Sequence, residues 1–139
     1  MLSQQTMPTL VSRDKEAEAK QILYKIATAL TPKVNESDYP LIRFNESKSV
    51  DYVRLTNTIY IGINNWKNMN LAQKRMAIIR EYVRAVKKRI SANEIKMPNN
   101  IMEILIYLNI YGYDKYYQQW KTESNENFHE IKRLLGNKE

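Results

Sequence analysis

The sequence has no cysteine and only one histidine, His129, among its 139 residues. Without cysteine, disulfides and thiolate metal sites are excluded, and a small secreted scaffold is disfavoured. One imidazole is too few for the usual histidine-based zinc sites. We therefore expect no bound metal and no cofactor. Residues 1–11 contain no charged leader followed by an apolar stretch, which predicts an intracellular, cytoplasmic protein.

Glycine and proline are also scarce, with three and four residues respectively. This scarcity argues against a long linker, and the isolated glycines Gly62, Gly112 and Gly136 form no phosphate-binding loop. No apolar run approaches the roughly 20 residues that span a bilayer, so we expect no membrane partner. The hydrophobic fraction of 43% and the charged fraction of 27% are typical of a folded domain. We predict one domain over residues 12–139, preceded by a flexible arm over residues 1–11.

Three runs in the first half of the chain have the composition of β-strands. They cover residues 41–44, 50–55 and 58–63. In the third run Ile59, Ile61 and Ile63 alternate with polar neighbours, so they face one side of a sheet. Asn57 suits the turn between the second and third runs, which predicts a hairpin. We expect a small, mostly antiparallel three-stranded sheet.

Apolar residues at helical spacing predict the other elements. The predicted helices cover Ser12 to Leu30, residues 71–90, the segment from Pro98 to about Gly112, and a last segment capped by Ser124 or Asn125 and ended by Gly136. Tyr113, Tyr116, Tyr117 and Trp120 also recur at helical spacing. An N-terminal helix, a sheet and then three to four helices predict an α+β fold.

The helix over residues 71–90 is the most unusual segment. Asn70 and Gln73 form a capping-box pattern at its start, and Ile79 and Val83 belong to its apolar stripe. Candidate polyanion-binding cations occur along it: Lys74, Arg80, Arg84, Lys87 and Lys88. With a net charge of +7, such a stripe could neutralise phosphates of a nucleic acid. The alternative is a solvated face that provides solubility.

Two other features can each be interpreted as functional or as purely structural. The cluster of tyrosines between Tyr107 and Tyr117, with Trp120, could stack on bases or pack against neighbouring helices. His129-Glu130 followed by Arg133 matches half of a His-Glu-x-x-His zinc motif. Arg133 cannot ligate a metal because its guanidinium stays protonated. A surface histidine is the alternative.

Residues 57–63, a short linker and residues 71–89 resemble the core of zincin-type metallopeptidases, particularly compact gluzincins. In that family a strand of similar sequence precedes a helix with a His-Glu-x-x-His motif, and a following helix supplies a third zinc ligand. The corresponding segment here reads Arg80-Glu81-Tyr82-Val83-Arg84. The resemblance implies that Arg80 and Arg84 replace the zinc-binding histidines, that Glu81 retains the position of the general base, and that Glu103 occupies the region of the third ligand.

A guanidinium cannot bind zinc, so the resemblance implies an inactive site in which Arg80 and Arg84 pair with Glu81 or Glu103. We therefore expect a non-catalytic binding protein whose partner is a protein or a nucleic acid. One alternative is a nucleic-acid-binding protein that uses the basic helix over residues 71–90. A second is an enzyme with an unrecognised acidic site around Glu81 and Glu103.

Overall fold

The computed structural model describes residues 10–87 and 97–136. Helix α2 (Leu10–Leu30) is followed by a short 3-10 turn, η1 (Glu36–Asp38), and by strands β1 (Leu41–Asn45), β2 (Val50–Val53) and β3 (Thr58–Gly62). The later elements are α3 (Ile63–Asn68), α4 (Leu71–Lys87), α5 (Asn99–Tyr111), the 3-10 turn η2 (Gln118–Trp120) and α6 (Lys121–Gly136). The expected α+β class is confirmed. Helix α2 also includes Leu10 and Val11, which were assigned to the arm, and residues 1–9 of that arm lie outside the described part.

The sheet is mixed, which corrects the expectation that it is mostly antiparallel. Its strand order is β1-β3-β2, with β1 parallel to β3 and β2 antiparallel to β3. The hairpin between β2 and β3 is confirmed, and Asn57 in its turn has a φ of 48°, which asparagine tolerates better than most residues. Strand periodicity reveals faces but not partners, and β1 pairs with the far strand of the hairpin.

Gly62 explains how this topology closes. The connection between β1 and β2 passes over the end of β3, where the Gly62 amide donates a 2.8 Å hydrogen bond to the Ser49 carbonyl. A Cβ atom on Gly62 would lie 2.0 Å from the Ser47 carbonyl oxygen, so only glycine fits without a shift. The strand ends there, and Ile63 begins α3 instead of continuing the row of Ile59 and Ile61.

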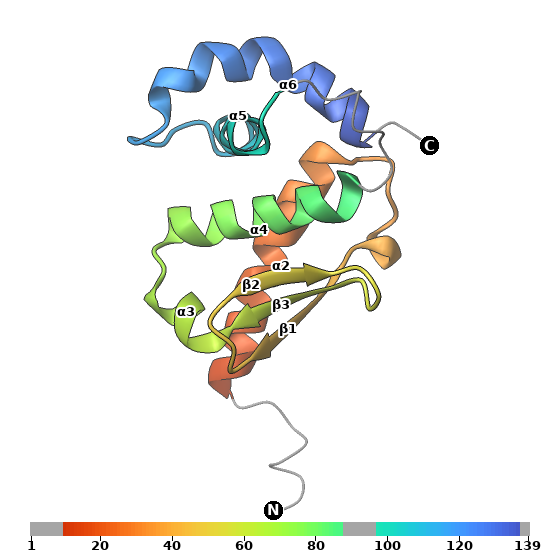
Figure 1. Cartoon of the computed structure of the whole chain (residues 1–139), viewed down its shortest axis with the longest axis vertical. Coiled ribbons are helices and arrows are strands. Elements are labelled where there is room, and N and C mark those ends of the chain that lie inside the picture. Colours follow the sequence, from red (N-terminus) through yellow and green to blue (C-terminus); the bar gives the residue numbers. More distant parts are fainter. Residues whose placement is uncertain (1–9, 88–96, 137–139) are drawn as a thin grey trace, which may run out of the picture.

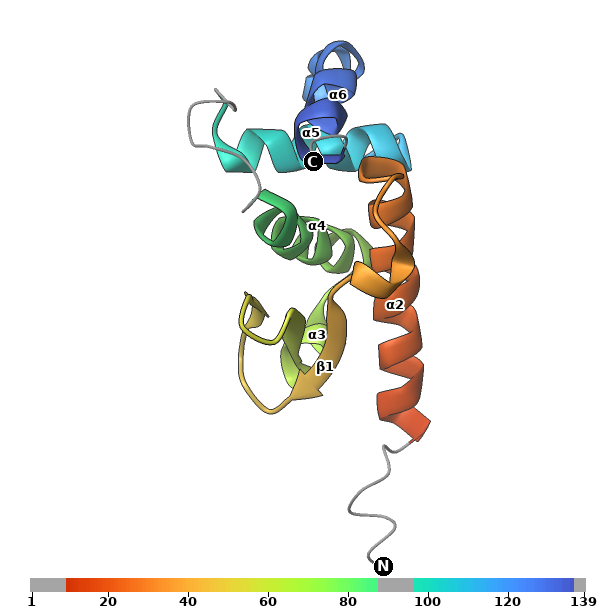
Figure 2. The ribbon, with the colours of Figure 1, turned by 90° about the vertical axis from the view of Figure 1, so that its right-hand side faces the viewer.

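The elements stack in layers around one core. Figure 2 shows α2 running alongside one face of the sheet, and Figure 1 shows α4 above β2, α5 crossing above α4 and seen end-on, and α6 over α5. Ile79 and Val83 on α4 are buried in the same apolar cluster as Ile59 and Ile61 on β3. Helix α4 reaches this core across the edge strand β2.

The second half of the chain differs from expectation in one segment. Helix α5 ends as predicted at Gly112, whose φ of 85° suits a C-terminal glycine. The residues after it form turns and η2 rather than a helix, and Tyr113 and Tyr116 are exposed. Helix α6 starts earlier than predicted, so Ser124 lies inside it and donates from Oγ to the Leu105 carbonyl at 2.7 Å. Among the described helices, none has both the length and the apolar character needed to cross a bilayer.

Candidate functional site

Helix α4 positions the candidate residues between the sheet and α5. Its buried side chains Ile79, Tyr82 and Val83 fix the orientation of the helix. Glu81 is also buried, at 4% exposure, whereas the side chains of Arg80 and Arg84 are 55% and 52% exposed. A stretch of five residues on one helix therefore presents a buried carboxylate between two half-exposed guanidinium groups.

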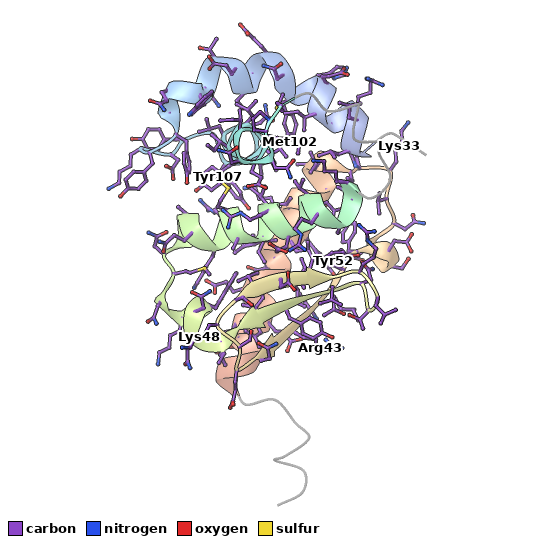
Figure 3. All side chains as sticks on the ribbon, viewed as in Figure 1. Lys33, Arg43, Lys48, Tyr52, Met102 and Tyr107 are labelled. Atoms are coloured by element: carbon purple, nitrogen blue, oxygen red, sulfur yellow. The ribbon has the colours of Figure 1, made fainter. Side chains whose placement is uncertain are left out.

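Glu81 joins α4 to the edge of the sheet. Its Oε1 accepts a 2.8 Å hydrogen bond from the backbone N–H of Tyr52 and another of 2.8 Å from Arg84 Nη1. Figure 3 shows Tyr52 on β2, in the space between the sheet and α4. Because β2 is an edge strand, this N–H has no neighbouring strand to bond, and the buried carboxylate replaces one.

Arg84 extends the contact to a second acid on β2. Its Nη1 donates to Asp51 Oδ1 at 2.8 Å as well as to Glu81. The hydrogen bond to Asp51 raises the pKa of Arg84 more than its partial burial lowers it, and the charge of Glu81 adds to the rise. The guanidinium group therefore stays charged and links β2 to α4 through its ion pairs with Asp51 and Glu81.

Glu103 faces Arg80 from the next helix. It is 6% exposed on α5, and its Oε1 lies 3.4 Å from Arg80 Nε. Burial raises the pKa of Glu103, the charge and hydrogen bond of Arg80 act in the opposite direction, and the charge of Glu81 raises it further. The structure thus brings together Arg80, Glu81, Arg84 and Glu103 as two adjoining ion pairs linking β2, α4 and α5.

This arrangement limits the chemistry available at the site. Glu81 Oε1 already accepts two hydrogen bonds, one from the Tyr52 backbone N–H and one from the guanidinium group of Arg84. Arginine does not ligate metal ions, and within residues 10–87 and 97–136 no three His, Cys, Asp or Glu side chains group closely enough to hold one. What the four residues can do is connect elements and present guanidinium donors to a ligand.

The other cations of α4 also have partners. Lys74 Nζ lies 2.9 Å from Glu18 Oε1 on α2 and 5.3 Å from the centroid of the Trp66 ring. Burial acts to raise the pKa of Glu18, but hydrogen bonds from Lys74 and Trp66 outweigh it, and the pKa lies below its ordinary value. Lys87 donates to Asn99 Oδ1. Lys88 lies outside the described residues.

The aromatic cluster divides into a packed part and an exposed part. Tyr107 is 1% exposed and contacts the rings of Tyr111 and Tyr117, which is helix packing. Tyr113 and Tyr116 are 66% and 68% exposed. His129 is exposed on α6.

Two residues of the site were not found from the sequence. Asp51 and the backbone N–H of Tyr52 meet α4 from about thirty positions earlier in the chain, and no local spacing signals such a contact. The only related feature in the sequence is the alternation of side chains along a strand. It predicts that Asp51 and Tyr52 lie on opposite faces of β2, but it does not predict that either residue contacts α4.

Comparisons of this chain with protein-family models, with curated proteins and with solved structures found no match.

Proposed function

We propose that this chain is a non-catalytic binding protein on a degenerate zincin-like scaffold. The observation that carries the proposal is the pair of contacts from Arg80 to Glu103 and from Arg84 to Glu81. Residues at the helix positions that would hold zinc in a metallopeptidase are arginines here, and they neutralise the two glutamates that such a site would use. A scaffold with these contacts keeps its surface for recognition, while both glutamates of the former site are engaged by arginines.

The layout is tested by restoring the missing ligands. Side chains at i and i+4 lie on one helix face about 5–6 Å apart, so histidines at positions 80 and 84 could share one metal ion. Glu103, whose Oε1 lies 3.4 Å from Arg80 Nε, is the candidate third ligand. We expect the double variant Arg80→His/Arg84→His to bind one zinc ion per chain after extensive dialysis, and the wild type to bind none. Metal analysis by mass spectrometry measures the stoichiometry.

A matched variant identifies the third ligand. Adding Glu103→Ala to the double variant should weaken zinc binding clearly, because two histidines on one helix are an incomplete site. Circular dichroism of each variant establishes that it is folded. A folded double variant without zinc, or one whose zinc binding is unchanged by Glu103→Ala, would refute the zincin-like layout.

Polyanion binding is the second candidate, and the exposure of Arg80 and Arg84 favours it. In this case affinity for DNA or RNA should fall steeply with salt. Replacing Arg84, Lys87 and Lys88 by glutamine should reduce the salt slope by about two to three units, at ~0.9 for each lost phosphate contact. The existing partners of Arg84 and Lys87 argue against it, since binding would have to displace them. An unchanged slope would eliminate this candidate.

A further inference from the structure

A pocket opens between the first half of α4 and the segment after α5. Its volume is about 440 Å³, within the usual range for small-molecule sites. Figure 1 shows the two segments on the same side of the molecule, where α4 begins. The lining of the pocket includes Met69, Met76, Tyr116 and Tyr117 together with the neutral polar side chains of Asn65, Asn70 and Gln73. The charged groups on its wall are Arg80 and Asp114.

Asp114 is a buried carboxylate without a counter-charge. It is 7% exposed, and its Oδ1 accepts a 2.8 Å hydrogen bond from the Tyr116 backbone N–H. No Lys or Arg in the described ranges forms an ion pair with it. A buried charge in this state is costly unless something pairs with it.

The second oxygen of Asp114 is left for a further hydrogen bond. Among the described side chains, the Tyr111 hydroxyl is the one fully buried polar atom without a hydrogen-bond partner. Asp114 Oδ2, which also has no partner there, therefore retains some exposure, and Asp114 lines the pocket. A donor bound in the pocket can reach this oxygen.

Arg80 supplies the opposite charge. It contacts Glu103 through Nε, which leaves most of its five N–H donors for another acceptor. Arg80 and Asp114 line the same pocket but form no ion pair with each other. The space between them can thus hold a ligand that carries both a cation and an anion.

We infer that this pocket binds a small zwitterion with an apolar side chain, its ammonium group on Asp114 and its carboxylate on Arg80. A purely cationic ligand is disfavoured by the net charge of +7, and a purely anionic one by the unpaired Asp114. Met69 and Met76 suit an apolar side chain because methionine adapts its shape to its neighbour. A free amino acid and a short peptide both have this chemistry.

The ligand side of the inference is tested on the wild-type chain. Amide shifts of the ¹⁵N-labelled protein would be followed during titration with L-leucine, with the dipeptide Leu-Leu, with 4-methylpentanoate and with 3-methylbutylamine. At least one zwitterion should give saturable shifts around residues 114–117, with a Kd of about 1 mM or below. The analogues lack the ammonium or the carboxylate and should bind at least about tenfold more weakly. Which zwitterion binds more tightly distinguishes the amino acid from the peptide.

The protein side uses Asp114→Asn. The amide oxygen still accepts the Tyr116 N–H, so the variant removes the charge and keeps the turn. It should weaken binding of the preferred zwitterion about tenfold, whereas Asp14→Asn, at an exposed aspartate on α2, should leave it unchanged. Equal binding by Asp114→Asn, equal binding of either analogue, or no saturable shift with either zwitterion would overturn the inference.

This inference deepens the proposed binding function and rests on it, yet the two tests fail separately. Zinc binding by the histidine variants does not involve Asp114. Zwitterion binding by the wild type requires no metal, and it does not depend on whether the scaffold is zincin-like.

Discussion

At the scale of single residues, the buried carboxylates differ in how they are compensated. Glu81 is bonded by a backbone N–H and a guanidinium group. Glu103 has one longer contact, to a half-exposed arginine. The first arrangement compensates the cost of burying a charge much better than the second. Substitutions at the two positions should therefore have different effects.

Replacing Glu81 tests the link between α4 and β2. Glu81→Ala leaves the buried Tyr52 N–H without an acceptor and should lower the free energy of unfolding by about 1–3 kcal/mol. Glu81→Gln retains an oxygen at the same place and should cost less. Urea unfolding at neutral pH measures both variants. Equal losses would mean that the charge of Glu81, and not its hydrogen bond to the strand, provides the stability.

Glu103 should give the stability profile a distinct dependence on pH. Its pKa in the folded state lies above the ordinary 4.5, so the folded protein binds the proton more tightly than the unfolded chain. The resulting stabilisation is complete below pH 4.5 and is lost as the pH rises through the raised pKa. Glu103→Gln lacks this loss.

The free energy of unfolding of Glu103→Gln, relative to wild type, should consequently increase as the pH rises from below 4.5. Denaturation midpoints across a pH series measure the difference. Glu126→Gln on the exposed face of α6 serves as the charge-matched control and should show little trend. A difference that stays constant with pH would contradict the raised pKa.

At the scale of elements, the sequence predicted whatever depends on local periodicity. The apolar spacing of α4 and the glycine after α5 were sufficient to place both helices. The six-residue α3 was missed because so short a segment shows little helical periodicity. Ile63 continues the alternation of Ile59 and Ile61 in the sequence, but the strand ends at Gly62. The turn after Gly112 was misassigned because Tyr113 and Tyr116 recur at helical spacing by coincidence. Tyr113 and Tyr116 are exposed, so the four aromatic residues from Tyr113 to Trp120 do not form one continuous buried face.

The orientation of α4 can be tested through Ile79. This side chain is fully buried in the core cluster, and Ile79→Ala should lower the free energy of unfolding by about 2–5 kcal/mol. Leu55→Ala is the matched control, because Leu55 is 94% exposed and its truncation leaves no cavity. Chemical denaturation of the three proteins gives the comparison. An unchanged midpoint for Ile79→Ala would mean that another face of α4 points inward.

At the scale of the whole molecule, the sequence predicted the part of the candidate site that lies on one helix but not its contacts with other elements. The i, i+1 and i+4 spacing of Arg80, Glu81 and Arg84 fixes their relation on one helix. Their contacts to Asp51 and Tyr52, and the distance to Glu103, depend on how the sheet edge and α5 pack against α4. The pocket with Asp114 is likewise formed by segments about forty residues apart.

The carboxylate that occupies the outer edge of β2 also bears on how copies of the chain behave toward one another. An open strand edge is a template for pairing with another molecule, and inward-pointing charged residues are one way in which proteins block it. Glu81→Ala should therefore aggregate at concentrations where wild type stays monomeric, as measured by light scattering and thioflavin fluorescence. Ile79→Ala, destabilised but with Glu81 in place, controls for unfolding, and equal aggregation of the two variants would remove this role. Aggregation of Glu81→Ala alone would show that this carboxylate, and not only the stability of the fold, keeps the edge of β2 from pairing with another copy.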